Sequence, residues 1–159
     1  MSIFAAMRKI GGIKELYMKI AVASDHGGLE LKNSLANYLA EKGFEVVDFG
    51  THTKDSCDYP DFAKPAAVAV ANGECERGIV CCTTGIGVCI TANKVKGVRC
   101  ALCQNDDMAE MTRRHNNANM IAFGQKYTSF DQAKAMVDIF LSTPFEGGRH
   151  ALRVDKIER

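Results

Sequence analysis

Residues 78–93 read GIVCCTTGIGVCITAN, and this stretch decides the fold. Its apolar opening, Ile79 to Cys81, is typical of a buried strand. The pattern breaks at residues 82–87 and then resumes with the composition of a helix. In open α/β sheets, ligands bind at such a turn because the first amides of the helix have no backbone partner. A thiolate at Cys82 beside those amides could remove a carbon-bound proton and stabilise the oxyanion that results.

The same turn also has a purely structural interpretation. Glycine-rich turns between strands and helices are common, and a free cysteine often packs as a small hydrophobe. Taken alone, the turn favours packing over catalysis. The case for catalysis therefore depends on what the rest of the chain places beside it.

The composition excludes several classes of protein. A length of 159 residues suits one domain with a sizeable core. Lys+Arg number 20 against 19 Asp+Glu, so no strong net field attracts nucleic acid or a membrane surface. No apolar stretch is long enough to span a bilayer. We expect one domain over residues 18–159, preceded by an N-terminal extension over residues 1–17.

The seven cysteines match neither a zinc knuckle nor a small disulfide scaffold in their spacing. Their odd number and apolar surroundings indicate free thiols in a reducing compartment. The sequence therefore predicts a cytoplasmic protein with no metal site.

Apolar strand patterns alternate with helical patterns along the whole chain. We expect strands at 19–23, 44–49, 78–82, 98–103 and 120–123, and helices at 29–42, 62–71, 86–94, 106–114, 130–141 and 150–159. Such alternation favours a parallel sheet with helices on both faces. The fold class predicted is α/β, a single doubly wound, mainly parallel five-stranded sheet of the Rossmann or flavodoxin-like kind.

Chemically capable residues follow most of these strands. They are Asp25 and His26; Asp58 and Tyr59; Cys82, Thr83, Thr84, Gly85 and Gly87; His115 and Asn116; and Arg149, His150 and Arg153. Ligands of open α/β sheets bind at the carboxyl ends of the strands. A phosphate ester held by arginines and histidine, with a sugar chain reaching a thiol base, would explain why these residue types recur.

Each candidate also has a simpler explanation. Asp25 could cap the helix that follows it, a role that aspartate fills well. His115 and Asn116 could be ordinary residues at a helix C-terminus, where histidine suits the dipole. Arg149 and Arg153, four residues apart, could form a solvated basic face, and Tyr59 could serve packing.

As a set, the motifs resemble the ribose-5-phosphate isomerase B family, which includes galactose- and allose-6-phosphate isomerases. The matching segments run in family order from Lys19 to about Glu158, and they are residues 24–28, 58–60, 82–87, 92–94, 115–116 with 119, 123–124 and 146–150 with 153. The resemblance implies an aldose–ketose isomerase without metal or cofactor. It also implies dimers, often paired into tetramers, with active sites at the subunit boundary.

The resemblance implies a role for individual residues. Cys82 matches the family's base and Thr84 its assisting hydroxyl, while Asp25 and His115 match residues that help to open the sugar ring. The residues that match or flank substrate and phosphate sites are His26, Asp58, Tyr59, Thr83, Gly85, Gly87, Asn116, Lys126, Arg149, His150 and Arg153. Two of these depart from the family, because Thr83 replaces a usual glycine and Lys126 a frequent arginine. Lysine keeps the charge of arginine but loses its bidentate fork.

We therefore predict interconversion of ribose 5-phosphate and ribulose 5-phosphate through a cis-enediolate, with Cys82 as the base. One alternative is a hexose-6-phosphate isomerase of the same family, and another is a non-catalytic phospho-sugar-binding module. A thiol redox protein is a third, although neighbouring residues of a strand such as Cys81 and Cys82 face opposite ways and make a poor dithiol pair.

Overall fold

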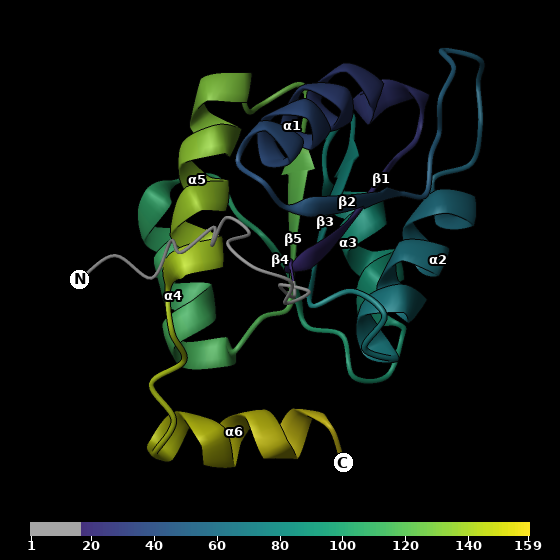
Figure 1. The fold of residues 1–159 in the computed structure, drawn as a ribbon. Helices are drawn as coiled ribbons and strands as arrows, with labels where there is room; N and C mark the ends of the chain where they lie inside the picture. The colour runs from purple at the N-terminus through teal and green to yellow at the C-terminus, as the bar shows by residue number, and fades with distance from the viewer. Residues whose placement is uncertain (1–16) are drawn as a thin grey trace, which may run out of the picture.

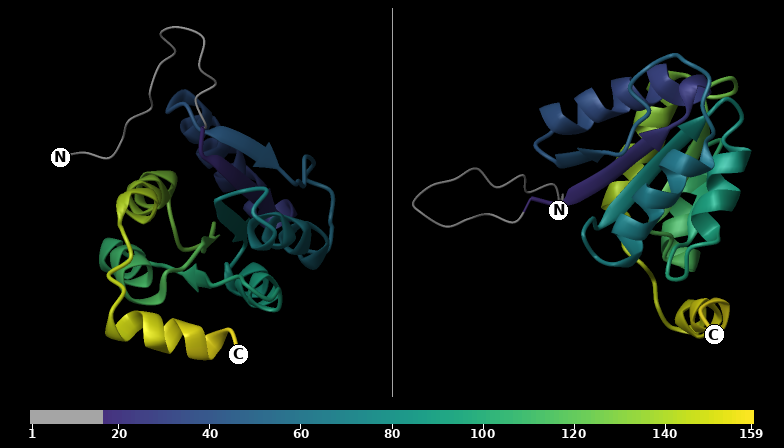
Figure 2. Two further views of the ribbon diagram at one scale, coloured as in Figure 1. Left: turned by 60° about the horizontal axis from the view of Figure 1, so that its bottom comes forward. Right: turned by 90° about the vertical axis from the view of Figure 1, so that its right-hand side faces the viewer.

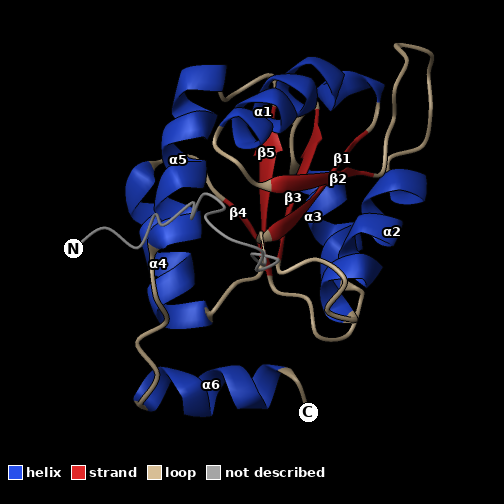
Figure 3. Cartoon of the chain, in the orientation of Figure 1, coloured by secondary structure: helices blue, strands red, loops and turns tan. Residues whose placement is uncertain are grey.

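Five strands form one sheet in the order β2-β1-β3-β5-β4, and every neighbouring pair is parallel (Figure 3). The computed structural model describes residues 17–159. The expected extension at 1–17 lies, apart from Tyr17, outside the described residues. The strands are β1 (Lys19–Ser24), β2 (Glu45–Asp48), β3 (Arg77–Cys82), β4 (Cys100–Leu102) and β5 (Met120–Gly124).

Helices connect the strands and cover both faces of the sheet (Figure 1). They are α1 (Leu29–Glu41), α2 (Pro60–Ala71), α3 (Ile86–Asn93), α4 (Asp106–Asn116), α5 (Phe130–Ser142) and α6 (Arg149–Ile157), with a 3-10 turn, η1 (His26–Gly28), ahead of α1. The predicted fold class is confirmed. No helix among residues 17–159 is both long and apolar enough to cross a membrane.

Alternate residues of each strand point into two separate cores. Ile20 and Val22 of β1 pack with the apolar faces of α1, α4 and α5. Ala21 and Ala23 face the opposite way and pack with α2 and α3. Helix α2 contributes mainly alanine to the second core, which lets it approach the sheet closely. Both faces of the strands are thus buried, as the continuous apolar runs of the sequence indicate.

Several element ends differ from those expected. Helix α2 begins at Pro60 rather than residue 62, because proline suits the first helical position, where no N–H is needed. Strand β4 covers three residues instead of six, because the chain before it turns through a hydrogen bond from Val98 N–H to the Val95 carbonyl. Helix α6 begins at Arg149, directly after Gly148, and ends at Ile157.

The β4 strand lies at the outer edge of the sheet, and Asn93 completes its backbone hydrogen bonding. The Asn93 side chain accepts a hydrogen bond from the Cys100 N–H at 2.8 Å and donates one to the Cys100 carbonyl at 2.8 Å. The side-chain amide therefore occupies the place that a neighbouring strand would take beside Cys100.

Helix α6 lies apart from the helices that flank the sheet, beyond the amino ends of the strands (Figures 1 and 2). Its C-terminal end is held by an ion pair between Glu158 and Arg99, the residue just before β4. Its N-terminal end follows a loop that docks on α4 through a hydrogen bond from Glu146 N–H to the Arg114 carbonyl.

The order of the strands places a switch point between β1 and β3. The chain leaves β1 for β2 on one side and then crosses to β3 on the other side of β1. Connections therefore diverge at the carboxyl ends of β1 and β3, which opens the crevice where doubly wound sheets bind ligands. Asp25 follows β1 and Thr83 follows β3, so the motifs singled out in the sequence lie at this crevice.

Candidate active site

The Cys82 thiol lies at the N-terminus of α3. Cys82 ends β3 and is 5% exposed, and its Sγ accepts a hydrogen bond from the Gly85 N–H at 3.0 Å. The Gly85 amide donor and the positive end of the α3 dipole therefore both face the sulfur. The position therefore suits a base.

Further amides line the same turn. The first hydrogen bond within the helix runs from Cys89 N–H to the Gly85 carbonyl. The Ile86 N–H donates to Thr84 Oγ1 at 3.3 Å, and the N–H groups of Gly87 and Val88 have no acceptor within the helix. These amides form a donor cradle beside the thiol, which is the arrangement that stabilises a developing oxyanion.

The two glycines of the turn serve close packing. Gly85 has φ of +78°, and a Cβ there would stand 2.7 Å from the carbonyl carbon of Phe123. A Cβ on Gly87 would stand 2.7 Å from the Tyr59 ring, so this ring lies directly on the first turn of α3. Tyr59 is also partly exposed, and it forms one wall of the crevice next to the cradle.

Asp25 caps the turn that follows β1. Its Oδ1 accepts hydrogen bonds from Gly27 N–H at 2.9 Å and Gly28 N–H at 3.2 Å. Asp25 therefore caps this turn through Oδ1. Its Oδ2 makes no hydrogen bond with any other described residue. The exposed His26 accepts from Cys57 N–H through Nδ1 at 3.2 Å, which ties the loop carrying Asp58 to the crevice.

Thr83 adopts an ordinary negative φ, since Asn117 is the one non-glycine residue with positive φ among those described. Its side chain lies over Gly27, where a Cβ would approach Thr83 Oγ1 to 2.1 Å. Thr83 therefore fills space between the β1 and β3 turns without backbone strain.

The segment after β5 closes the crevice. The Gln125 N–H donates to the Cys82 carbonyl at 2.9 Å and the Lys126 N–H to the Thr83 carbonyl at 3.0 Å. The Gln125 side chain in turn accepts from the Leu31 N–H of α1 at 2.9 Å. Lys126 therefore lies at the carboxyl edge of the sheet, where the sequence analysis expected ligands to bind. Gln125 was not predicted, and its place directly after the last residue of β5 was the available signal.

His115 and His150 lie together at the junction of α4 and α6. Their rings stack with centroids 4.2 Å apart and planes 8° from parallel. Glu146 Oε2 lies 3.3 Å from His150 Nε2 and 4.0 Å from His115 Nε2. Its Oε1 accepts a hydrogen bond from Arg114 Nε at 2.6 Å. The sequence analysis gave Glu146 no role, and its place before Gly147-Gly148 in a matching segment was the signal.

The surroundings of this second cluster lower the pKa values of both His150 and Glu146, for different reasons. Burial, the nearby His115 and Arg149 lower the pKa of His150, and Glu146 partly offsets them. The hydrogen bond from Arg114 holds the pKa of Glu146 below its usual range. Glu146 is therefore a carboxylate at neutral pH, and it faces two imidazoles and the Arg114 guanidinium.

The cluster offers two imidazoles and a carboxylate, with ligand atoms within 4.8 Å of one another. Imidazole nitrogens bind a metal in the plane of the ring. Two stacked, parallel rings cannot both hold one ion in their planes, and the carboxylate is already paired with Arg114. The arrangement fits a metal centre poorly and fits an anion better.

The two clusters lie at opposite edges of the sheet. Asn116, next to His115, accepts a hydrogen bond from Arg99, which precedes β4, and the Arg99 carbonyl accepts from Asn119 N–H just before β5. Cys82 stands at the other end of β3, four residues or about 13 Å beyond Gly78, which pairs with Met120 at the start of β5. His115, Asn116, Arg149, His150 and Arg153 therefore do not meet Cys82 within one chain, contrary to their grouping at one edge in the sequence analysis.

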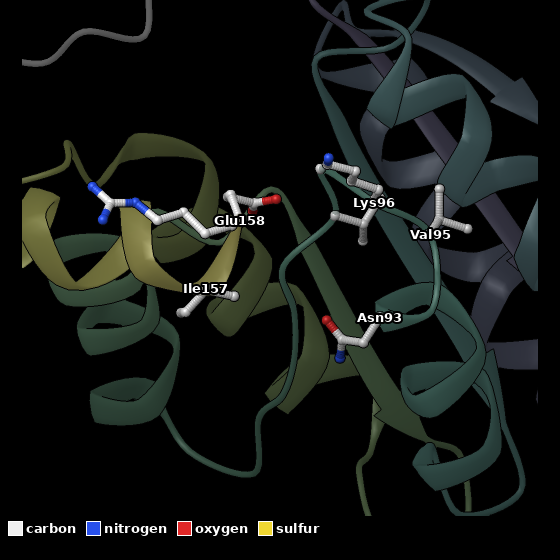
Figure 4. Close-up of a pocket in the computed structure, with 8 residues that line it drawn as sticks. Asn93, Val95, Lys96, Ile157 and Glu158 are labelled. Carbon is white, nitrogen blue, oxygen red and sulfur yellow. The ribbon is translucent and has the colours of Figure 1, made fainter.

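Two surface pockets lie beside α6 rather than at the thiol. One of about 230 Å³ is lined by Asn93, Val95, Lys96, Ile157, Glu158 and neighbours (Figure 4). A second of about 480 Å³ includes Arg99, Thr112, Asn116 and Ile157. Figure 4 shows Ile157 beneath α6, across the hollow from the loop after α3. Neither of these two pockets contains a residue of the thiol turn.

A doubly wound α/β sheet with a thiol and an amide cradle at its switch point defines an enzyme equipped to move a proton on carbon. The chain belongs to the Ribose/Galactose Isomerase family, whose model matches residues 20–157. It is 43% identical over 139 residues to ribose-5-phosphate isomerase B of Escherichia coli, covering 87% of this chain and 93% of that protein.

Solved structures agree with this assignment. Ribose-5-phosphate isomerase B of Clostridium thermocellum is 53% identical, with a TM-score of 0.88 over 89% of this chain and 95% of that one. The Mycoplasma genitalium enzyme with bound ribulose 5-phosphate is 44% identical, with a TM-score of 0.87 over 91% and 97%. The chain is thus an aldose–ketose isomerase of sugar phosphates.

Proposed function

We propose that this isomerase interconverts ribose 5-phosphate and ribulose 5-phosphate, with Cys82 as the base. The observation that carries the proposal is the hydrogen bond from Gly85 N–H to Cys82 Sγ, at the start of a helix and among unpaired amides. Both the E. coli and the M. genitalium relatives are named ribose-5-phosphate isomerase B, and the M. genitalium structure holds ribulose 5-phosphate.

The reaction follows from this geometry. The Cys82 thiolate takes the proton from C2 of the open-chain aldose, and the C2–H electron pair forms the C1–C2 double bond. The charge that develops on O1 is met by the amides of the 83–87 turn. After a proton has moved from O2 to O1 with the help of the Thr84 hydroxyl, the thiol returns its proton to C1. The amide donors supply the polarisation, and no metal enters the proposed sequence.

The remaining roles need a second copy of the chain. We assign ring opening to His115 with Asp25, and phosphate binding to Arg149 and Arg153 with His26. His115 and the two arginines lie at the edge opposite Cys82, so they act on a substrate held at a neighbour's thiol. A closed two-fold dimer supplies each site twice.

Exposed apolar side chains mark where the second copy docks. Ile86 and Ile90 lie one turn apart on α3, and Ile90 is 57% exposed. Leu152 and Ile157 of α6 are 68% and 61% exposed. Large apolar side chains left exposed on neighbouring turns of a helix are typical of an interface. Light scattering of a fully active preparation should show a dimer or tetramer, and a fully active monomer would overturn the shared site.

The deciding assay measures kcat/KM for ribose 5-phosphate, allose 6-phosphate and galactose 6-phosphate, with free sugars as controls. We expect ribose 5-phosphate to be preferred and the free sugars to react poorly. Preference for a hexose phosphate would support the alternative substrate, which the position of Thr83 beside the crevice keeps open. Cys81 and Cys82 pack into different cores, which removes the basis for a dithiol redox role. The cytoplasmic location stays a prediction.

A further inference from the structure

Glu146 contacts both imidazoles of the cluster and the helix that carries one of them. Its backbone N–H donates to the Arg114 carbonyl at 3.1 Å, and its Oε1 accepts a hydrogen bond from the Arg114 guanidinium. Its other oxygen, Oε2, is the atom that faces the rings of His115 and His150. One carboxylate therefore fixes the 146–150 segment on α4 and also sets the charge next to the stack.

The His150 ring is the buried member of the pair. Its side chain is 8% exposed, and Nε2 has no partner with hydrogen-bond geometry although Glu146 Oε2 is 3.3 Å away. The His115 side chain is 39% exposed and can reach solvent or a ligand. A small movement of the loop would convert the close approach at His150 into a charge-assisted hydrogen bond.

The charges around the stack are otherwise positive. Arg114 comes from α4, while Arg149 and Arg153 come from α6, and these two act on His150 in the direction that discourages a proton. Glu110 of α4 pairs with Arg114 Nη1 at 3.0 Å. Among the described residues whose charge acts on His150, Glu146 alone favours its protonated form.

Two stacked rings 4.2 Å apart do not carry two positive charges beside three arginines, because like charges this close repel strongly. A second proton on the stacked pair is therefore disfavoured. We propose that Glu146 is a positioning residue for this pair: its carboxylate holds the two rings in register and keeps the single proton on them for delivery through the exposed His115.

This inference rests on the proposed function for its catalytic meaning, since the proton is the one that His115 gives to the sugar during ring opening. The stack and the charge of Glu146 can be tested without activity. Glu146→Gln keeps the size of the side chain and an oxygen that can accept from Arg114, so the substitution changes mainly the charge. Glu110→Gln is the matched control, because it removes the other acidic partner of Arg114 and touches neither ring.

The first measurement is an NMR titration of the imidazole C–H signals in the intact protein. In Glu146→Gln the midpoint of the pair should fall by about one pH unit, the size expected when one nearby opposite charge is lost. Glu110→Gln should leave the midpoint unchanged. Glu146→Asp keeps a carboxylate and should restore the midpoint in part. A midpoint in Glu146→Gln equal to that of the parent, or equal shifts in the Gln and Asp variants, would overturn the inference.

The second measurement is the pH profile of kcat/KM for ribose 5-phosphate. A general acid loses its proton above its pKa, so the limb on which activity falls as pH rises should move to lower pH in Glu146→Gln by the same shift. Glu110→Gln should keep the parent profile. A shifted titration in a protein with no isomerase activity would reject the proposed function and keep the role of Glu146. Normal isomerase activity with an unshifted titration would support the proposed function and reject the role of Glu146.

Discussion

The Thr83 side chain lies on Gly27, so the turn after β3 and the turn after β1 are in direct contact at the crevice. A Cβ built on Gly27 would stand 2.1 Å from Thr83 Oγ1 and 3.3 Å from Asp25 Oδ1. Thr83 is therefore packed against the loop that holds a proposed ring-opening residue, Asp25.

Gly27→Ala should destabilise the protein and disturb the active site together, because the added methyl group overlaps Thr83. Overpacking of this kind costs about 1–3 kcal/mol in unfolding free energy. Thr83→Gly combined with Gly27→Ala should recover much of the loss, since Oγ1 is then gone and a 3.2 Å contact with the Thr83 amide nitrogen remains. Urea unfolding of the single and double variants measures the coupling. Strictly additive effects would show that the two side chains do not share this space.

Thr83→Gly should change substrate preference more than it changes the reaction. Removing the side chain opens the space between Gly27 and the thiol turn. We expect the ratio of kcat/KM for hexose and pentose phosphates to move several-fold, or about 1 kcal/mol of differential transition-state binding. An unchanged ratio for both sugar sizes would make the role of Thr83 purely structural.

Cys82→Ala should abolish isomerisation while the protein stays folded and binds sugar phosphate. Cys82→Ser should be severely impaired too, because a hydroxyl is a far weaker acid than a thiol and supplies little base at neutral pH. Exchange of the C2 proton with deuterated solvent, followed by NMR, tests the step directly. Near-normal exchange in Cys82→Ala would remove the thiol from the mechanism. Cys103→Ala is a suitable control, because burial raises the pKa of Cys103 to about 12 and keeps it a thiol.

Arg149→Ala and Arg153→Ala should weaken substrate binding with a smaller effect on kcat. Both side chains are exposed at the start of α6. A charge-assisted contact with phosphate is worth about 1.5–3 kcal/mol, or about one to two decades in affinity. Inhibition by inorganic phosphate should weaken in parallel with KM. Lys156→Ala on the same helix is the control, and an equal loss there would indicate a general effect of surface charge.

Mixed subunits should restore activity that each parent variant lacks. Cys82→Ala and His115→Ala disable residues from opposite edges of the sheet. In a two-fold dimer, a hybrid of the two has one site with both defects and one intact site. Random mixing should therefore recover about a quarter of the parental activity. Hybrids, separated by a tag on one subunit and still inactive, would show that each site is built from a single chain.

The positions of β1, β3 and β5 followed from the sequence because both faces of these three strands are buried. Ile79 to Cys81 and Met120 to Phe123 are apolar runs that only a covered parallel sheet accommodates. The element ends were less certain, because they depend on local hydrogen bonds such as the Val98–Val95 turn before β4.

The crevice residues could be predicted for a related reason. In a parallel sheet, whatever follows a strand lies at its carboxyl edge, which placed Asp25 and Cys82 together. The rule does not hold for residues at the end of the connecting helix, since a helix of 11 residues carries the chain about 16 Å back toward the other edge. His115 at the end of α4 is such a residue. The partners of Glu146 also depend on how α6 folds back onto α4, which no local pattern encodes.

The side-chain amide of Asn93 protects the outer strand β4 against pairing with another chain. A parallel sheet with an open outer strand invites strand-by-strand growth into fibrous aggregates, and proteins guard such edges. Here one side chain blocks the edge at Cys100 by mimicking a neighbour's backbone. A second copy of the chain is thereby hindered from pairing with β4 at Cys100, and the helices beside this edge remain as surfaces for ordered contact.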